Sequence, residues 1–262
     1  MLLFDFLEYH HRWPRIDQPQ TFCEKILHRK LFDRDPGMVA LSDKILAKRR
    51  VSELLGPEWI TPSIWAGHVL TPECERRWPI PYVLKASHGC GWNFFVRTQE
   101  EQVWDSINRE AAGWLGKTWG LREWIYTQIE PGLLVEPYIG SINEVPADYK
   151  LFVFGGRTRF VQVDLGRGMR HEQYFYDLDW NRLPWTFVCE YSKGEVPRPC
   201  SLEKMIWGAN RLGEAFPFVR VDLYEIDGKP RFGECTFYPT GGRNEFKPRS
   251  VELEIGQMWP DS

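Results

Sequence analysis

The 262-residue sequence lacks the features that would mark a membrane or nucleic-acid-binding protein. It has no run approaching the roughly 18 apolar residues of a membrane span. The apolar start, residues 1–9, carries Asp5 and Glu8 and has no basic beginning, which is not the pattern of a signal peptide. The net charge is only −3, and no long run of one sign occurs, so no strong field recruits nucleic acid. We therefore expect a protein with no nucleic-acid partner and no transmembrane segment.

Motifs based on cysteine and on common nucleotide loops are also missing. The six cysteines form no Cys-x-x-Cys pair and no zinc-finger spacing, which is typical of reduced thiols, so we expect a cytoplasmic protein. No Gly-x-Gly-x-x-Gly stands between a strand and a helix, and no Gly-Lys-Ser/Thr is present. Rossmann and P-loop nucleotide sites are therefore excluded.

The most informative segment present is residues 220–242, which alternates as two strands around an Asp-Gly turn. Asp222 and Glu234 lie on opposite arms, so strand pairing brings their carboxylates together. Arg220 precedes Asp222 by two residues and shares its face. Mg²⁺ usually binds one or two carboxylates together with substrate phosphates. The hairpin predicts such a site, and a solvated acidic hairpin is the alternative interpretation.

A second segment has the composition of a phosphate-binding turn. Lys85 closes an apolar strand over residues 79–86, and the glycine-bearing turn 87–93 leads into a returning strand. Such a turn offers backbone N–H donors and the lysine a point charge, which together suit a polyphosphate. A surface lysine beside a hairpin turn is the alternative.

Two further strands could bind the rest of a nucleotide. Residues 133–139 form an apolar strand whose extended backbone, around Glu136, could hydrogen-bond an adenine edge. Asp148 begins a hairpin that turns at Gly155-Gly156, and its carboxylate could receive ribose hydroxyls. Lys150 shares the face of Asp148, because side chains two apart on a strand point the same way.

Helices complete the predicted order of elements. One is expected from Leu41, capped by Ser42 and stopped at Gly56-Pro57, and others over residues 99–116 and 201–215. The strands and hairpins alternate with these helices without a regular βαβ repeat. The predicted fold class is therefore mixed α/β (α+β).

Four segments, in this order, resemble the ATP-grasp superfamily of ATP-dependent ligases, which join a carboxylate to an amine. They are Asp43-Lys44-x-x-x-Lys48 with Gly56 and Thr61-Pro62; Tyr82-Val-Leu-Lys85-Ala-Ser-His-Gly-Cys-Gly91; Leu134-Val-Glu136-Pro-Tyr-Ile139; and Arg220-x-Asp222 with Gly233-Glu234-x-Thr236 and Pro239. Further details, such as Phe-Val-Gln-Val-Asp164-x-Gly-Arg167, are most similar to the teichuronopeptide-biosynthesis (TupA-like) branch of bacterial surface-polysaccharide clusters.

The resemblance implies an ATP-grasp fold, in which two α/β subdomains hold ATP between them. A short N-terminal segment with the Asp-Lys helix would cover residues 1–78. The lid subdomain would cover residues 79–135 and the catalytic subdomain residues 136–262.

It also implies a reaction and a set of site residues. ATP and a carboxylate would give an acyl phosphate, which an amine would convert to an amide. The implied ATP-binding residues are Lys44, Lys85, Ser87, His88, Gly89, Gly91, Glu136, Tyr138, Ile139 and Asp148. The implied Mg²⁺ ligands are Asp222, Glu234 and Thr236, and the implied catalytic residues are Arg220, Lys150 and Arg167, the last orienting the substrate carboxylate.

Two departures from the family leave questions open. The first is Thr236, which stands where the family usually has Asn. The second is that only about 40 residues precede the Asp-Lys helix, so the acceptor site would come from elsewhere in the chain or from a partner protein or oligomer. The branch implies a uronic acid and an amino acid as substrates. An ATP-grasp kinase acting on a small molecule or sugar, and a non-catalytic nucleotide- or glycan-binding protein, are the alternatives.

Overall fold

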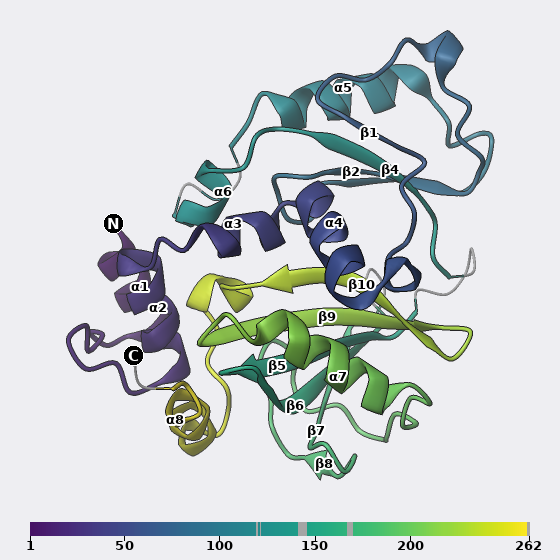
Figure 1. Cartoon of the computed structure of the whole chain (residues 1–262). Helices are drawn as coiled ribbons and strands as arrows, with labels where there is room; N and C mark the ends of the chain where they lie inside the picture. The colour runs from purple at the N-terminus through teal and green to yellow at the C-terminus, as the bar shows by residue number, and fades with distance from the viewer. Residues whose placement is uncertain (119, 121, 141–145, 167–169, 261–262) are drawn as a thin grey trace. The chain divides into compact units, whose positions relative to one another are not determined.

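The structure is a computed structural model that describes residues 1–118, 120, 122–140, 146–166 and 170–260. The chain forms two compact units. One consists of Arg34–Glu144, and the other joins Met1–Asp33 to Val145–Ser262. Figure 1 traces both units from the N-terminus to the C-terminus. The first residues of the chain therefore belong to the same unit as its second half. The functional subdomains expected at 79–135 and 136–262 stay a prediction.

The unit of residues 34–144 is built on a four-stranded antiparallel sheet. Its order is β1 (Trp65–Gly67), β4 (Leu133–Pro137), β2 (Tyr82–Ala86) and β3 (Asn93–Val96). Helix α5 (Trp104–Leu115) packs on this sheet, and its Ile107, Ala111 and Trp114 join a core rich in aromatic side chains. The predicted strands and the helix after them are confirmed, with α5 beginning later than expected.

The helices before this sheet differ from the sequence prediction at one point. α3 (Pro36–Ser42) and α4 (Lys44–Leu55) are separate helices, and Ser42 ends the first instead of capping the second. The cap is Asp43, whose side chain accepts hydrogen bonds from the backbone N–H groups of Ile45 (2.8 Å) and Leu46 (3.2 Å). A carboxylate next to the positive end of a helix is stabilising, which favours Asp43 as the cap. Three short helices, η1 (Pro57–Trp59), η2 (Glu73–Glu75) and α6 (Trp124–Thr127), complete the unit's regular elements within the described residues.

The other unit is built on a six-stranded antiparallel sheet. Its order is β10 (Lys229–Thr236), β9 (Phe218–Ile226), β5 (Asp148–Phe154), β6 (Arg157–Leu165), β7 (Glu172–Tyr176) and β8 (Arg182–Leu183). Both predicted hairpins are confirmed. The turn between β9 and β10 uses Asp227 and Gly228 at φ 51° and 67°, as a type I′ turn requires. β7 and β8 were not predicted.

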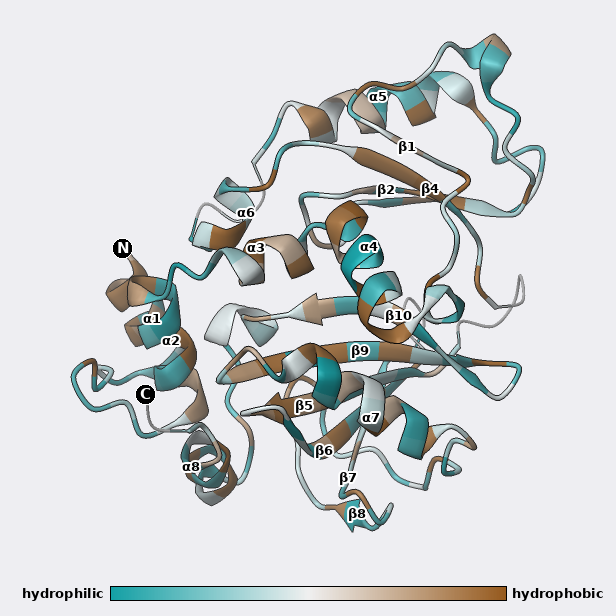
Figure 2. Cartoon of the chain, in the orientation of Figure 1, coloured by the Kyte–Doolittle hydropathy of each residue, from teal (hydrophilic) through white to brown (hydrophobic). Residues whose placement is uncertain are grey.

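The two faces of this sheet have different covers. α7 (Leu202–Gly213) packs against β5, β6 and β9 on one face, so closely that a Cβ on Gly213 would lie 2.5 Å from a Val153 methyl. On the other face, Phe152 and Phe218 contact Phe22 of helix α2 (Phe22–Phe32). The chain's apolar residues follow the strands of this sheet (Figure 2).

Phenylalanines fill only one end of that second face. Following the same alternation along β5 and β9, the next residues are Lys150, Asp148, Arg220 and Asp222, all buried. One face is thus aromatic at one end and charged at the other.

Helices from both ends of the chain complete this unit. α1 (Leu2–His10) precedes α2, and α8 (Arg249–Gln257) packs against α2. A short helix η3 (Pro239–Gly242) follows β10. Among the described residues, no helix has the length and apolar character to cross a membrane.

Candidate functional site

The hairpin β9–β10 places the two predicted metal carboxylates opposite each other. Glu234 pairs with Asp222, and Thr236 pairs with Arg220. The register shifts between Phe232 and Glu234, so Gly233 is the extra residue of a bulge. A Cβ on Gly233 would lie 3.0 Å from the Asp222 carbonyl oxygen, so the close approach needs glycine. The bulge sets the direction of the Glu234 side chain, and the pairing of Asp222 with Glu234 is confirmed.

Asp222 is buried between two cations. The guanidinium of Arg220 donates through Nε to Oδ1 (2.7 Å) and through Nη2 to Oδ2 (2.6 Å), and Lys150 Nζ donates to Oδ2 (2.7 Å). Burial by itself raises the pKa of Asp222, but the charges and hydrogen bonds of Arg220 and Lys150 outweigh it and hold that pKa below its usual value. Arg220 also donates to Thr236 Oγ1 (3.0 Å) and lies 3.8 Å from Glu234 Oε1.

Lys150 connects three carboxylates of the sheet. It pairs with Asp148 and Asp222, and lies 3.9 Å from Asp164 on β6. Burial alone lowers the pKa of Lys150, but the neighbouring carboxylates raise it, so the ammonium form is retained. Together with Glu234 the cluster holds four carboxylates against Lys150 and Arg220, a formal excess of two negative charges. We call this set the acidic cluster.

The unit of residues 34–144 carries a second buried carboxylate between cations. Glu136 on β4 pairs with Lys85 on β2 (2.6 Å) and with Lys48 on α4. Burial raises the pKa of Glu136, but the two lysines outweigh it and lower that pKa overall. Burial lowers the pKa of Lys48 despite its carboxylate partner. These three residues, with one negative and two positive charges, are the basic cluster.

Lys48 belongs to the Asp43-Lys44-x-x-x-Lys48 motif, but no role was predicted for it from the sequence. Its spacing of four from Lys44 places both lysines on one face of α4. That spacing was the available signal. The partner, Glu136, lies 88 residues further along the chain, so the ion pair is visible only in the structure.

The glycine turn between β2 and β3 is anchored at its beginning. Lys44 Nζ donates to the carbonyl of Gly89, and the Lys44 backbone N–H donates to Ser87 O (3.2 Å). His88 is buried, with Nε2 3.0 Å from Trp114 O and Nδ1 accepting from the Gly132 N–H at 3.3 Å. The ring of His88 therefore holds the turn, and a contribution of His88 to a nucleotide would come from its backbone.

The later part of the turn is open. Gly91 has φ 74°, and a Cβ built there would meet no atom within 4 Å among the described residues. After β4, the Tyr138 N–H donates to Pro81 O (3.0 Å), and the Tyr138 ring contacts Phe95. Ile139 follows directly, and Arg167 lies outside the described residues.

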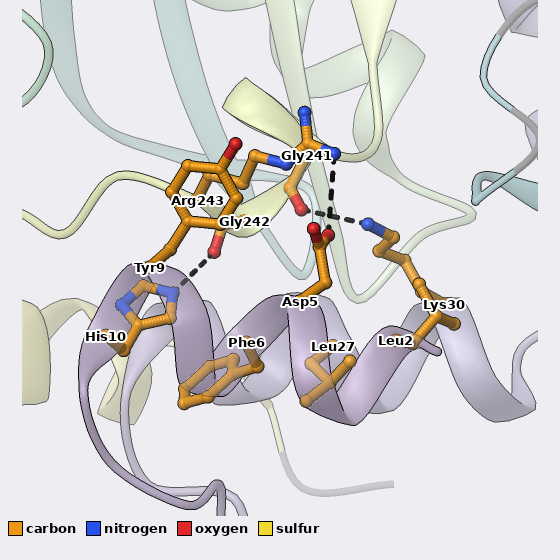
Figure 3. Close-up of a pocket in the computed structure, with 10 residues that line it drawn as sticks. All are labelled: Leu2, Asp5, Phe6, Tyr9, His10, Leu27, Lys30, Gly241, Gly242 and Arg243. Carbon is orange, nitrogen blue, oxygen red and sulfur yellow. Dashed lines mark hydrogen bonds and ion pairs between the residues drawn. The ribbon is translucent and has the colours of Figure 1, made fainter.

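The structure also has a small pocket that the sequence analysis did not predict (Figure 3). It lies between α1, α2 and η3. Lys30 Nζ donates to Gly241 O (2.9 Å), His10 Nε2 donates to Gly242 O (2.8 Å), and Arg243 lies 3.5 Å from Asp5. None of its described lining residues is a predicted site residue. These contacts fix the segment that follows β10.

The acidic cluster fits a magnesium ion that is shared with a ligand. Among the described residues no group of three or more His, Cys, Asp and Glu side chains is arranged to hold a metal alone. Mg²⁺ does not need such a group, since one or two carboxylates plus phosphates and waters suffice. Asp222 and Glu234 meet that requirement, although Asp222 must share its oxygens with Arg220.

Comparison with known proteins identifies the family. The family model "TupA-like ATPgrasp" matches residues 24–259, which is most of the chain. The chain belongs to the TupA-like ATP-grasp family. The resemblance drawn from the sequence motifs is thereby confirmed. No curated protein matches the chain.

Several solved structures resemble this ATP-grasp chain at low identity. They include D-alanine–D-alanine ligase from Bacillus anthracis complexed with ATP (13% identity, TM-score 0.48, covering 84% of this chain and 65% of that one). L-amino acid ligase from Bacillus licheniformis has 13% identity and a TM-score of 0.49, with 84% of this chain and 47% of that chain covered. The ATP-grasp ligase PsnB complexed with minimal precursor has 12% identity and a TM-score of 0.44, with 77% and 53% covered. The chain thus spans between 47% and 65% of the length of these structures.

Proposed function

We propose that the protein is an ATP-dependent carboxylate–amine ligase. A carboxylate would take the γ-phosphoryl group of ATP to form an acyl phosphate, and an amine would displace phosphate to form an amide. Membership of the ATP-grasp family supports ATP as the phosphoryl donor. The observation that carries the proposal is the pairing of Asp222 with Glu234 beside Arg220.

The acidic cluster would serve the metal and the transferred group. Asp222 and Glu234 would hold Mg²⁺, which when bound neutralises phosphate charge during transfer. Arg220, whose Nε and Nη2 bind Asp222, would bind the transferred phosphoryl group through Nη1, which takes no part in those two bonds. Lys150 would hold Asp222 and Asp148 in position, and Thr236 would support the metal side through its hydroxyl.

The basic cluster and its surroundings would serve the nucleotide. Lys85, Lys48 and Lys44 would bind phosphates, with backbone N–H groups of the turn from Ser87 to Gly91. The backbone from Glu136 through Tyr138 to Ile139 would bind adenine, and Asp148 would bind ribose. Arg167 would orient the substrate carboxylate.

The substrate classes follow from the branch of the family. We propose a uronic acid of a bacterial surface polysaccharide as the carboxylate and an amino acid as the amine, with the reaction in the cytoplasm. The excess negative charge of the acidic cluster means that an anionic acid would need the metal or Arg220 to approach it.

The test is a hydroxamate trap. The protein is incubated with ATP, Mg²⁺ and a panel of uronic acids, and hydroxylamine converts any acyl phosphate to a hydroxamate. ADP release that needs both an acid and an amine supports the ligase. Phosphorylation of a sugar alcohol without an acid would establish the kinase instead, and ATP binding without turnover would establish a binding protein.

The matching variant is Glu234→Gln. The Glu234 side chain is 37% exposed, so its loss tests the chemistry with little effect on folding, whereas Asp222 is fully enclosed by cations. Loss of a metal ligand should remove several kcal/mol of transition-state stabilisation. We therefore expect the turnover rate to fall on the order of a thousandfold. Glu254→Gln, an exposed carboxylate on α8, is the control and should keep full activity.

A further inference from the structure

His171 lies directly before β7 with its ring between a carboxylate and a thiol. Its Nε2 is 3.5 Å from Asp164 Oδ2, and its Nδ1 is 3.3 Å from Cys189 Sγ, in the segment after β8. The Asp164 side chain is 3% exposed, and the His171 side chain is 32% exposed. Nε2 is buried and makes no hydrogen bond in the described structure, so its contact with Asp164 is electrostatic, while part of the ring remains accessible.

The neighbours of the ring select one tautomer. A carboxylate beside Nε2 favours a proton on that nitrogen, which leaves the lone pair on Nδ1 as an acceptor. Asp164 is itself held, since Gln162 Nε2 donates to its Oδ1 (2.8 Å). Cys189 is held too, because its backbone N–H donates to Gln173 Oε1 (3.2 Å). An acceptor nitrogen whose ring is oriented by a buried carboxylate is the arrangement of a general base.

The thiol itself is a poor candidate for the nucleophile. Burial, with Asp164 adding to it, raises the pKa of Cys189, so the group stays a neutral S–H. A thiolate would be needed for attack. The Cys189 thiol is therefore the group that faces Nδ1 of His171 as a hydrogen-bond donor. Another donor could take its place.

His171 connects to the acidic cluster through short contacts. Asp164 lies 3.9 Å from Lys150, which is bound to Asp222 at 2.7 Å. Asp164 and Asp148 pair across β6 and β5, so their side chains share the face that carries the predicted metal carboxylates. Strand β9 is two strands from β6, a separation of about 10 Å.

We propose that His171, oriented by Asp164, is the base that accepts the proton of the amine substrate. The inference rests on the proposed ligase function. The amine of an amino acid enters as the ammonium, and the proton that it must lose to become a nucleophile passes to Nδ1 of His171. As the free amine nitrogen then attacks the acyl carbon, the bond from carbon to the phosphate oxygen breaks. Phosphate leaves with the electron pair and takes up the second proton that the nitrogen loses. The charged and titratable groups that face the ring are Asp164 from β6 and Cys189 from the segment after β8, with Lys150 behind Asp164.

The experiment compares two nucleophiles in one variant. His171→Gln and the control His68→Gln, an exposed histidine of the other unit, are assayed with the uronic acid found in the hydroxamate screen. The nucleophile is either an α-amino acid or hydroxylamine, which is largely unprotonated at neutral pH and so needs no deprotonation before it attacks. In His171→Gln we expect amide formation to fall about 100-fold and hydroxamate formation to change less than about threefold.

Other outcomes overturn the inference. Equal losses with both nucleophiles would mean a structural role, and unchanged amide formation would mean no role. The Cys189→Ser variant should still form the amide. If the variant no longer forms the amide, and a thioester can be trapped on the unaltered protein, the thiol is the nucleophile instead. If His171→Gln does not fold, Asp164→Asn replaces it, with the same expected split. Absence of hydroxamate from the unaltered protein would overturn the proposed function and this inference with it.

Discussion

Each unit of the molecule buries one carboxylate between two cations, but the two clusters have opposite net charge. In the basic cluster, Glu136 neutralises only one of the charges of Lys48 and Lys85. In the acidic cluster, Asp222 holds Arg220 and Lys150. Three further carboxylates bring the net charge of this cluster to −2. An excess of positive charge attracts phosphates, and an excess of negative charge attracts a metal cation. In the proposed nucleotide chemistry, the same local motif would serve the phosphates in one unit and the metal in the other.

The clusters also differ in how deeply their cations are buried. The side chains of Lys48 and Lys85 are 12% and 28% exposed. Those of Arg220 and Lys150 are 10% and 3% exposed. The cations of the basic cluster are thus the more exposed pair, chiefly because of Lys85, whereas Lys150 is enclosed in the folded core.

The largest effect is expected from Asp222→Asn. It leaves two buried cations with less compensation, and breaking a buried pair costs about 3–5 kcal/mol of unfolding free energy. Urea unfolding followed by circular dichroism measures this loss. Glu136→Gln should cost clearly less, since its lysines reach solvent. Equal losses in the two variants would contradict the difference in burial.

Another buried carboxylate, Glu252 on α8, is held by backbone donors, namely the N–H groups of Cys23 (2.7 Å) and Phe246 (2.8 Å). Burial raises its pKa from 4.5 to about 7, opposite to the shift of Asp222 and Glu136. A raised pKa gives stability that is complete below pH 4.5 and lost as pH rises through about 7. We expect a loss of about 3 kcal/mol across that window.

The check is unfolding at a series of pH values for the unaltered protein and for Glu252→Gln. The amide does not titrate, so the difference in unfolding free energy between the two proteins should change between pH 4.5 and 7. A constant difference would show that Glu252 does not titrate in this range.

A smaller effect is expected on nucleotide binding. Lys85→Ala removes a cation from the basic cluster, and charge-assisted hydrogen bonds contribute about 1.5–3 kcal/mol. ATP affinity, measured by calorimetry with Mg²⁺, should fall by about 10-fold to 100-fold. Lys117→Ala, an exposed lysine of the same unit, is the control. Unchanged affinity in Lys85→Ala would leave Lys85 as a surface lysine paired with Glu136.

The smallest effect concerns the helix that carries Lys44 and Lys48. Asp43→Ala removes the N-cap of α4 and should cost about 1 kcal/mol. Ser42→Ala, the cap expected from the sequence, should be close to neutral because Ser42 belongs to α3. Thermal unfolding of both variants separates the two assignments, and a larger loss for Ser42→Ala would favour the original prediction.

Much of the candidate site was predictable because its residues are close in sequence. Asp222 and Glu234 are joined by a two-residue turn, and alternation within a strand determined that Arg220 shares their face. The turn after Lys85 was visible as a cluster of glycines between two apolar runs. These signals depend on local backbone geometry, and the structure confirms each of the two hairpins.

The contacts that give the clusters their charge were not predictable. Lys48 lies 88 residues from Glu136, and Lys150 lies 72 residues from Asp222. Strand order decides which of these meet, and the sequence pattern does not specify strand order.

The sequence by itself determined the family, the hairpins and the identity of the charged residues. Local spacing is sufficient for these, since turns and alternation depend only on neighbouring residues. The tertiary structure decided that one face of the six-stranded sheet is aromatic at the end under α2 and charged at the other end. It also decided that each unit surrounds one carboxylate with two cations. The physical reason is that burying a charge is costly without a partner, and only packing of distant strands and helices supplies that partner.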